Sequence, residues 1–282
     1  TFLDFMDRVP FYGMIVACND DPLLRRLLPE VQRRTVTYGT KRGSDFQVKI
    51  PTVAPKDAGG MGQPTSDDSR PLSRFSVRYR EQDLGEFTLH VPGVHNVLNA
   101  TAAIAVGVGL DISVDAIRTA LDQFRGVDRR FQLRGHAAGV SVIDDYGHHP
   151  TEIKATLAAA RQCGFHKIHV IFQPHRYTRT RDLIEEFTTA FNLADSLFVL
   201  DIYAASEKPI EGITGEILAQ RIREKTANVG RYASSPAEAV DAAAAVAQEG
   251  DMILTLGAGS VSQFGPMILE KLKEREVARV ES

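Results

Sequence analysis

The chain has 282 residues, a formal net charge of −3, and 43% hydrophobic and 24% charged residues. This composition is typical of a soluble globular protein, and the length is sufficient for two domains. The charge argues against nucleic acid as a partner, so any anion site has to be local. The sequence also lacks an apolar run of the roughly 20 residues that a membrane span requires, so we predict no membrane partner. Cys18 and Cys163 are too few for a disulfide framework or a structural zinc site, and we predict two buried thiols in a cytoplasmic protein.

The first residues, "TFLDFMDRV", already have the apolar spacing of a helix, with no capping residue before them. We interpret this as a chain that begins inside a helix and lacks an upstream region. Strands are predicted at 14–18 and 34–39, around a helix at 21–28. The segment at about 54–71 is rich in Gly, Pro, Ser and Asp, which favours a mobile surface insertion.

Beyond this insertion the sequence predicts an antiparallel strand pair followed by two helices. The strands cover 72–80 and 84–91, where apolar and polar residues alternate. The first helix covers 97–110 and is rich in small residues. The second covers 113–124, with Ser113 as its N-cap and with four side chains expected to be buried, namely Val114, Ile117, Leu121 and Phe124.

The last 150 or so residues alternate strands with helices. The predicted strands are 139–144, 167–172, 196–202, 228–233 and 251–256, and the predicted helices are 150–163, 181–193, 214–226, 236–248 and most of 260–276. "SPAE" at 235–238 fits a capping box. This alternation indicates an α/β fold with an open, Rossmann-like parallel sheet, in which ligands bind at the carboxyl ends of the strands. Four polar loops fall there: "DDYGHHP", "QPHRYTRTRD", "DIYAASEKPIEG" and "LGAGS".

The first of these loops leaves two interpretations open. Asp144, Asp145, His148 and His149 together offer metal ligands, although the HExxH spacing of helical zinc sites is absent. Adjacent histidines point in different directions, however. In the second interpretation His149 therefore packs or caps the following helix and His148 alone is functional.

The second loop concentrates positive charge at the start of a helix. His175, Arg176, Arg179 and Arg181 lie within seven residues, and guanidinium groups match carboxylates or phosphates bidentately. A solvated basic helix start is the alternative, but positive charge there opposes the helix dipole. We therefore predict an anion site.

Two further stretches carry weaker signals for a nucleotide. Asn96 and Asn99 share one helical face with His95, and the amides of the two asparagines suit a purine edge as well as they suit capping and packing. "LGAGS" could approach a phosphate, but such a stretch is more often a tight turn. No GxxxxGK[ST] occurs in the 282 residues, so the sequence contains no Walker A loop.

The strings "HNVLNATAA", "RRFQ", "IDDYGHHPTEI", "FQPHRYTRT" and "LTLGAGSV", in this order, resemble the Mur ligases over nearly the whole chain. The resemblance implies a truncated central ATP-binding α/β domain at 1–128 and a C-terminal Rossmann-like ligase domain at 129–282. It also implies ATP-dependent amide formation in peptidoglycan synthesis, in the cytoplasm. A branch of the family that recycles murein peptides usually has Phe-Ala where Tyr146 and Gly147 stand here, so the resemblance favours the branch that adds L-alanine. It implies that L-alanine is joined to the carboxylate of UDP-N-acetylmuramate through an acyl phosphate.

The resemblance also implies roles for particular residues. His95, Asn96 and Asn99 would face adenine, Asp145 the ribose and Arg130 the ATP phosphates. Tyr146 and His148, with Arg130, would act at the reacting centre. His175, Arg176 and Arg179 would bind the L-alanine carboxylate.

One departure from the family pattern limits these expectations. The P-loop and the Mg²⁺ ligands of the family would lie before Thr1, so we expect no metal site in these residues and no ligase activity of this chain alone. A metal-dependent hydrolase and a non-catalytic nucleotide-binding module remain the alternative functions. The oligomeric state is open, with a homodimer as one alternative.

Overall fold

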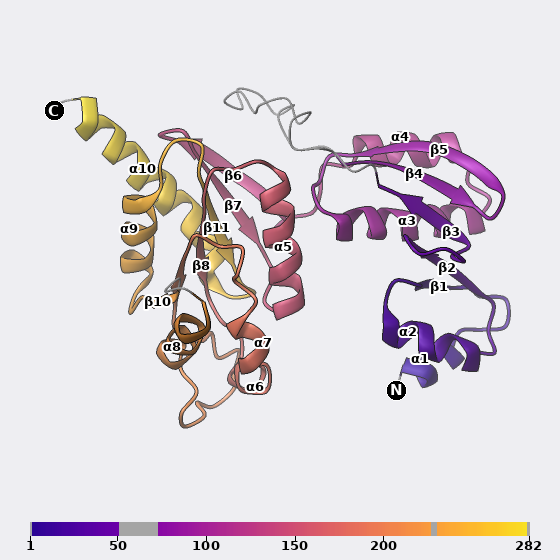
Figure 1. Ribbon diagram of the computed structural model, residues 1–282, viewed down its shortest axis with the longest axis horizontal. Helices are drawn as coiled ribbons and strands as arrows, with labels where there is room; N and C mark the ends of the chain where they lie inside the picture. Colours follow the sequence, from indigo (N-terminus) through magenta and orange to yellow (C-terminus); the bar gives the residue numbers. More distant parts are fainter. Residues whose placement is uncertain (1, 51–72, 227–229, 281–282) are drawn as a thin grey trace. The chain divides into compact units, whose positions relative to one another are not determined.

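The computed structural model describes residues 2–50, 73–226 and 230–280. The described residues up to Arg125 form one compact unit and those from Gly126 onward form a second (Figure 1). The insertion predicted at about 54–71 lies outside the described residues. The domain boundary predicted after residue 128 stays a prediction.

The first unit contains a five-stranded mixed sheet with its strands in sequential order. Strands β1 (Ile15–Cys18), β2 (Thr35–Gly39) and β3 (Phe46–Lys49) are parallel, whereas β4 (Ser73–Tyr79) and β5 (Gln82–Leu89) form an antiparallel pair. The predicted antiparallel pair is therefore confirmed. The sequence analysis missed β3, which is only four residues long.

The helices of this unit are α1 (Phe2–Asp7), α2 (Pro22–Leu27), the short 3₁₀ helix Leu28–Glu30, α3 (Val94–Gly109) and α4 (Val114–Gln123). The side chain of Ser113 caps α4 as predicted, accepting a hydrogen bond from the Ala116 N–H. Ile117 is buried, but the prediction for Phe124 was wrong because this side chain is 41% exposed. The helix ends one residue earlier, and the extended backbone of Phe124 takes its ring off the buried face.

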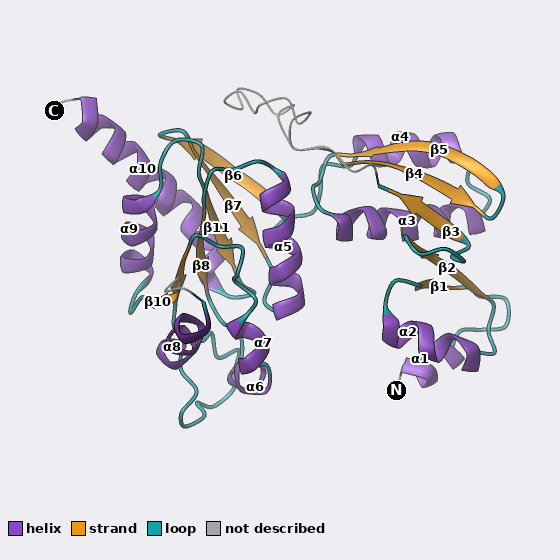
Figure 2. Ribbon diagram, in the orientation of Figure 1, coloured by secondary structure: helices purple, strands orange, loops and turns teal. Residues whose placement is uncertain are grey.

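The second unit contains a six-stranded sheet in the order β10-β9-β8-β11-β7-β6 (Figure 2). Strands β7 (Val140–Asp145), β8 (Ile168–Phe172), β9 (Ser196–Val199), β10 (Gly230–Tyr232) and β11 (Met252–Leu256) are parallel. Strand β6 (Gln132–Ala137), which was not predicted, is antiparallel to β7 at the edge of the sheet. The five parallel strands confirm the Rossmann-like prediction.

Helices cover both faces of this sheet. They are α5 (Pro150–Gln162), α6 (Tyr177–Asp182), α7 (Ile184–Thr188), α8 (Gly215–Lys225), α9 (Pro236–Val246) and α10 (Phe264–Val280), with the 3₁₀ helix η3 (Ser260–Gln263) before the last. Successive strand side chains point to opposite faces. Val170 accordingly packs in a core with residues of α5, α7 and α8, whereas Ile171 packs with residues of α9 and α10.

The helix predicted at 181–193 was wrong in its bounds. The chain instead forms α6 and α7, with a break at Leu183, where φ is −116° and ψ is 19°. Phe187 and Phe191 are nevertheless fully buried, as their spacing indicated. The tertiary packing of these rings therefore does not require one continuous helix.

Capping interactions fix two of the helix starts. His149 is the N-cap of α5 and forms a capping box with Glu152. At α9 the Ser235 side chain accepts from the Glu238 N–H, but Glu238 accepts from Ser234 rather than from Ser235, so the box predicted for "SPAE" is incomplete.

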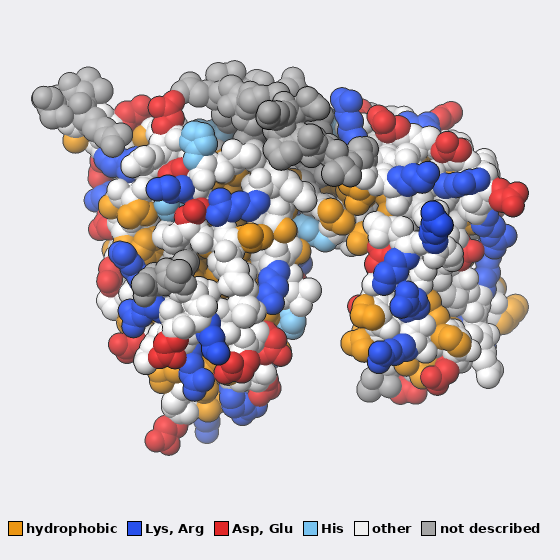
Figure 3. All heavy atoms as spheres, in the orientation of Figure 1, with side chains coloured by type: hydrophobic (Ala, Val, Ile, Leu, Met, Phe, Trp, Pro, Cys, Tyr) orange, Lys and Arg blue, Asp and Glu red, His pale blue; other side chains and the backbone are white. Residues whose placement is uncertain are grey.

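Surface and core properties agree in part with the composition. In Figure 3, Lys and Arg side chains are interspersed with Asp and Glu over the displayed face of the second unit. None of the helices in the described residues is long and apolar enough to cross a membrane.

Cys163 is a buried free thiol whose burial raises its pKa to about 12, whereas Cys18 is partly exposed, contrary to prediction.

Candidate active site

The candidate site lies at the carboxyl ends of four neighbouring parallel strands in the second unit, β9, β8, β11 and β7. Strand β11 lies between β7 and β8, although it is the last strand in the chain. The helices that follow β8 and β11 pack on opposite faces of the sheet. Such a change of face leaves a crevice at the carboxyl edge of an open α/β sheet.

Four aromatic side chains form a continuous row across the loops that follow β7, β8 and β9. The ring centroids of Tyr146 and His148 are 5.2 Å apart, those of His148 and His175 5.7 Å, and those of His175 and Tyr203 5.5 Å. The last pair is nearly parallel, with an interplanar angle of 10°. The structure thus brings together Tyr146, His148 and His175, which the sequence placed on two different loops.

Arginine side chains extend this row at His175. Arg179 Nη1 lies 3.1 Å from His175 Nδ1 and also donates to the His175 carbonyl oxygen at 3.3 Å. Because a guanidinium can only donate, His175 Nδ1 accepts and the ring proton resides on Nε2. Burial, and then the positive charges of Arg179 and Arg176, lower the pKa of His175 below its ordinary value of 6.5, with Glu207 opposing. The imidazole is therefore neutral at neutral pH.

His148 has the complementary hydrogen-bond polarity. Its Nδ1 lies 3.0 Å from the Tyr146 carbonyl oxygen, which can only accept, so in the neutral ring Nδ1 carries the proton. Nε2 of His148 is then the acceptor, whereas Nε2 of His175 is a donor. The two neighbouring rings thus offer one proton acceptor and one proton donor.

Two further guanidinium groups lie over the Tyr146 ring. The Cζ atoms of Arg129 and Arg130 are 4.8 Å and 5.6 Å from its centroid. Arg130 is half exposed and its Nη1 is 3.7 Å from Glu152 Oε1. Arg129, to which the sequence analysis gave no role, donates through Nε to Asp144 at 3.3 Å and through Nη2 to the carbonyl oxygen of Gly257.

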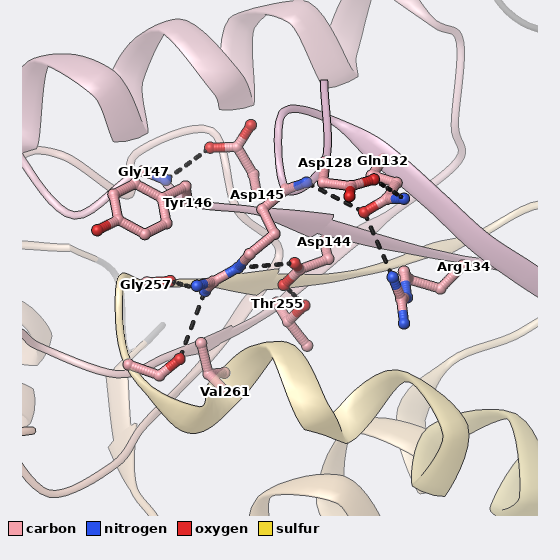
Figure 4. A network of polar contacts seen from close by, with 12 residues as sticks. Asp128, Gln132, Arg134, Asp144, Asp145, Tyr146, Gly147, Thr255, Gly257 and Val261 are labelled. Atoms are coloured by element: carbon pink, nitrogen blue, oxygen red, sulfur yellow. Dashed lines mark hydrogen bonds and ion pairs between the residues drawn. The ribbon is translucent and has the colours of Figure 1, made fainter. Parts of the chain in front are cut away.

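The two carboxylates at the end of β7, Asp144 and Asp145, accept hydrogen bonds from other groups of the protein (Figure 4). Asp144 is 1% exposed and accepts from the Thr255 hydroxyl at 2.7 Å as well as from Arg129. Asp145 is 5% exposed and accepts from the N–H groups of Phe131 and Gly147, at 2.8 Å and 2.7 Å. Burial raises the pKa of Asp145, and these two hydrogen bonds oppose the rise.

This arrangement does not support the interpretation of the loop as a metal cluster. The carboxylates of adjacent strand residues, Asp144 and Asp145, point to opposite faces and each has its own internal donors. His149 Nδ1 accepts from the Thr151 N–H at the start of α5, as the alternative interpretation required. Within the described ranges no group of three or more His, Cys, Asp or Glu side chains could hold a metal ion.

The predicted adenine residues lie in the first unit, at the start of α3. His95 and Asn96 are half-buried in its first turn, and Asn99 is exposed one turn later. Asn96 Nδ2 donates to the Pro92 carbonyl oxygen at 2.7 Å, so this amide has the local contact of the capping interpretation. Its role toward a purine stays a prediction.

Glycines of the "LGAGS" loop permit close approach between loops of the site. Gly257 has φ +142°, and a Cβ there would lie 2.6 Å from the Gln173 carbonyl oxygen. A Cβ on Gly259 would lie 2.8 Å from Cγ of Tyr203. Both contacts agree with a tight turn. The nearby Tyr203 and Glu207 were missed, although their loop had been placed at the sheet edge.

Together, the open parallel sheet and the imidazole–guanidinium row define an α/β protein with basic and aromatic side chains gathered at the carboxyl edge of its sheet. Residues 1–107 match the family model of the Mur ligase middle domain, and residues 129–259 match that of the Mur ligase glutamate ligase domain. The chain belongs to the Mur ligase family.

Curated relatives extend the match over nearly all of the chain. It is 62% identical to a UDP-N-acetylmuramate–L-alanine ligase from Koribacter versatilis, over 99% of this chain and 58% of the relative. It is 54% identical to the ligase of the same name from Solibacter usitatus, over 96% of this chain and 54% of the relative. The chain thus spans only about half the length of the curated relatives it matches.

Solved structures agree with this assignment. UDP-N-acetylmuramate-alanine ligase MurC from Thermotoga maritima superposes with a TM-score of 0.68 at 26% identity, covering 93% of this chain and 52% of that one. MurF ligase from the same organism, in complex with ADP, gives a TM-score of 0.69 at 19% identity, covering 97% and 57%. The second likeness concerns the fold alone.

Proposed function

We propose that the chain is part of an ATP-dependent ligase that joins L-alanine to the carboxylate of UDP-N-acetylmuramate through an acyl phosphate. The observation that carries this proposal is the row from Tyr146 through His148 and His175 to Arg179. It combines guanidinium groups for a carboxylate with an imidazole acceptor. The names of the relatives at 62% and 54% identity supply the substrates. We expect the reaction to take place in the cytoplasm, and a homodimer stays an untested alternative.

Arg176 and Arg179 are the proposed ligands of the amino-acid carboxylate. Guanidinium groups bind carboxylates through paired, charge-assisted hydrogen bonds. Arg179 is held against His175 by two hydrogen bonds, so one part of its fork is fixed before a ligand arrives. The donor Nε2–H of His175 adds a third polar contact for the same carboxylate.

His148 is the proposed proton acceptor for the amino group. L-alanine enters as an ammonium ion and has to lose a proton before its nitrogen can attack a carbonyl carbon. His148 Nε2 has the acceptor polarity for that proton, because Nδ1 is committed to the Tyr146 carbonyl oxygen. Tyr146 and Arg130 contact each other beside this ring, and we propose that they stabilise the negative charge at the reacting centre.

The proposed cosubstrate is ATP, with Mg²⁺. Arg130 is half exposed and its Nη1 is 3.7 Å from Glu152 Oε1, so it could reorient toward a phosphate. Asp145 suits the ribose less well in this conformation, because Phe131 and Gly147 already donate to its two oxygens. His95, Asn96 and Asn99 remain the proposed adenine contacts.

The experiment is an assay of the full gene product with ATP, Mg²⁺, UDP-N-acetylmuramate and L-alanine. We expect one phosphate released per amide formed, with product mass raised by one alanyl residue. Glycine and D-glutamate serve as controls for the amino acid. Phosphate release without an amide product, or ligation of D-glutamate in preference to L-alanine, would overturn the proposal. The expected inactivity of the 282-residue chain alone is tested in the same assay.

A further inference from the structure

The loop that follows β9 has no role in the proposed chemistry, yet it contacts the anion site closely. We call residues 201–213 the β9 loop and residues 173–176 the β8 loop. The β8 loop contains His175 and Arg176, and α6, which follows it, contains Arg179. The geometry of the proposed carboxylate site therefore depends on what holds the β8 loop.

The β8 loop has a strained backbone at Arg176. This residue has φ 71° and ψ 136°, a conformation that residues with a Cβ rarely adopt. Such a conformation is unfavourable and persists only when neighbouring structure holds it. Arg176 is also the N-cap position of α6, and its side chain makes no capping hydrogen bond there. From within α6, the N–H and the hydroxyl of Thr180 donate to the Arg176 carbonyl oxygen at 3.1 Å and 2.9 Å, and further contacts come from the β9 loop.

Backbone hydrogen bonds from the β9 loop provide one part of this support. The Tyr203 N–H donates to the Pro174 carbonyl oxygen at 2.8 Å, and the Arg176 N–H donates to the Tyr203 carbonyl oxygen at 2.9 Å. These two bonds pair His175 with Tyr203 as an isolated parallel bridge. They fix the backbone on both sides of His175, including the strained residue.

The Tyr203 side chain provides a second part. Its ring is stacked on the His175 ring with an interplanar angle of 10° and a centroid distance of 5.5 Å. Arg179 meets His175 through Nδ1, an edge atom of the same ring. The imidazole is therefore held on one face by Tyr203 and at one edge by Arg179, which fixes where its Nε2–H points.

Glu207 provides the third part, at the first turn of α6. Its carboxylate accepts from the Thr178 N–H at 3.0 Å and from the Thr178 hydroxyl at 2.7 Å. These hydrogen bonds lower the pKa of Glu207, so the group is ionised at neutral pH. Its Oε1 is also 4.0 Å from Arg176 Nη1. One carboxylate thus holds the helix turn that precedes Arg179 and attracts the Arg176 side chain.

From these contacts we propose that Tyr203 and Glu207 are positioning residues for the amino-acid carboxylate site formed by His175, Arg176 and Arg179. This inference rests on the proposed function, because it names residues that prepare the same site. Neither side chain has to touch the substrate. Tyr203 sets the plane of the His175 ring, and Glu207 sets the start of α6 and the direction of Arg176.

The test measures the KM for L-alanine, the KM for ATP and kcat for the full gene product with Tyr203→Ala or Glu207→Ala. An aromatic pair of this kind contributes about 0.5–1.5 kcal/mol, so Tyr203→Ala is expected to raise the alanine KM about two- to twelvefold. Glu207→Ala is expected to raise the alanine KM severalfold. The KM for ATP stays the same in both variants, which a general loss of structure would not allow.

Matched variants separate positioning from folding. Tyr203→Phe keeps the ring and is expected to have an alanine KM close to that of the wild type, whereas Glu211→Ala removes an exposed carboxylate of the same β9 loop and leaves all constants unchanged.

If the wild type ligates L-alanine but Tyr203→Ala and Glu207→Ala keep its KM, the inference is wrong and the proposed function stands. If the wild type does not ligate L-alanine, the proposed function itself fails. If Tyr203→Ala does not fold, Glu207→Ala decides, because Glu207 lies outside the hydrophobic cores.

Discussion

Replacing Arg179 by alanine tests the proposed carboxylate site at the guanidinium group that hydrogen-bonds to His175. Arg179 Nη1 is 3.1 Å from His175 Nδ1 and 3.3 Å from the His175 carbonyl oxygen. Arg179→Ala removes both contacts and one guanidinium fork. It leaves the backbone hydrogen bonds of the β8 loop to Tyr203 in place, so the loop itself is expected to persist.

The magnitude follows from the kind of contact that is lost. A hydrogen bond to a charged group contributes about 1.5–3 kcal/mol, and each 1.4 kcal/mol is about a factor of ten in affinity. We therefore expect Arg179→Ala to raise the KM for L-alanine about tenfold to hundredfold. The KM for ATP is expected to change much less, because the affected contact binds only the amino acid.

The assay is steady-state phosphate release by the full gene product at varied L-alanine. Arg181→Ala is the matched control, because Arg181 lies on the same helix, is half exposed and pairs with its neighbour Asp182 at 2.7 Å. Arg181→Ala is expected to keep the wild-type alanine KM. An unchanged alanine KM in Arg179→Ala, or an equal rise in both variants, would show that Arg179 does not bind the carboxylate of L-alanine.

Three further predictions concern titration and stability of the chain. Because the pKa of His175 is lowered in the folded chain, the unfolded chain protonates first as the pH falls, so the contribution of His175 to the free energy of unfolding rises with pH up to about 6.5 and then levels off. In urea titrations, the difference in the free energy of unfolding between wild type and His175→Gln should therefore vary with pH below about 6.5 and stay constant above it. Asp144→Ala removes the carboxylate that accepts from the Thr255 hydroxyl at 2.7 Å and from Arg129 Nε at 3.3 Å, and should lower the free energy of unfolding by about 1–3 kcal/mol; an unchanged urea midpoint would contradict this. Phe191→Ala should cost about 3–5 kcal/mol because the ring is fully buried, whereas Leu193→Ala, 42% exposed, should cost far less in the same measurement.

Local sequence signals predicted the elements that surround the site. The apolar run of β7, the proline that opens α5 and the apolar spacing of that helix all act over a few residues, and the structure confirms these elements. The position of the polar loops at the carboxyl edge follows from the alternation of strands and helices. The convergence of Tyr146, His148 and His175 could therefore be anticipated from two loops alone.

Other features depend on contacts between residues far apart in the chain. The hydrogen bond from Arg129 to the carbonyl oxygen of Gly257 joins residues 128 positions apart, and no local pattern marks it. The position of β11 between β7 and β8 likewise depends on pairing with strands far away in the chain. Strand β6 was missed because its residues are mostly part-exposed, with only Ala137 buried, and so lack a clear apolar alternation.

Burial of side chains at helix ends was the least predictable feature. Phe124 fits the apolar face of α4 by spacing but lies one residue beyond its end, where the backbone becomes extended. Leu183 breaks the helix predicted at 181–193, although Phe187 and Phe191 remain in the core. Spacing predicts which side chains share a face only as long as the helix continues.

The proposed carboxylate site can be seen directly in a crystal structure of the full gene product with UDP-N-acetylmuramate and L-alanine bound. We expect the alanine carboxylate at hydrogen-bond distance, roughly 3 Å, from the guanidinium groups of Arg176 and Arg179, with the alanine nitrogen facing His148. A carboxylate bound elsewhere, with both guanidinium groups turned away from it, would show that the assignment of these residues is wrong.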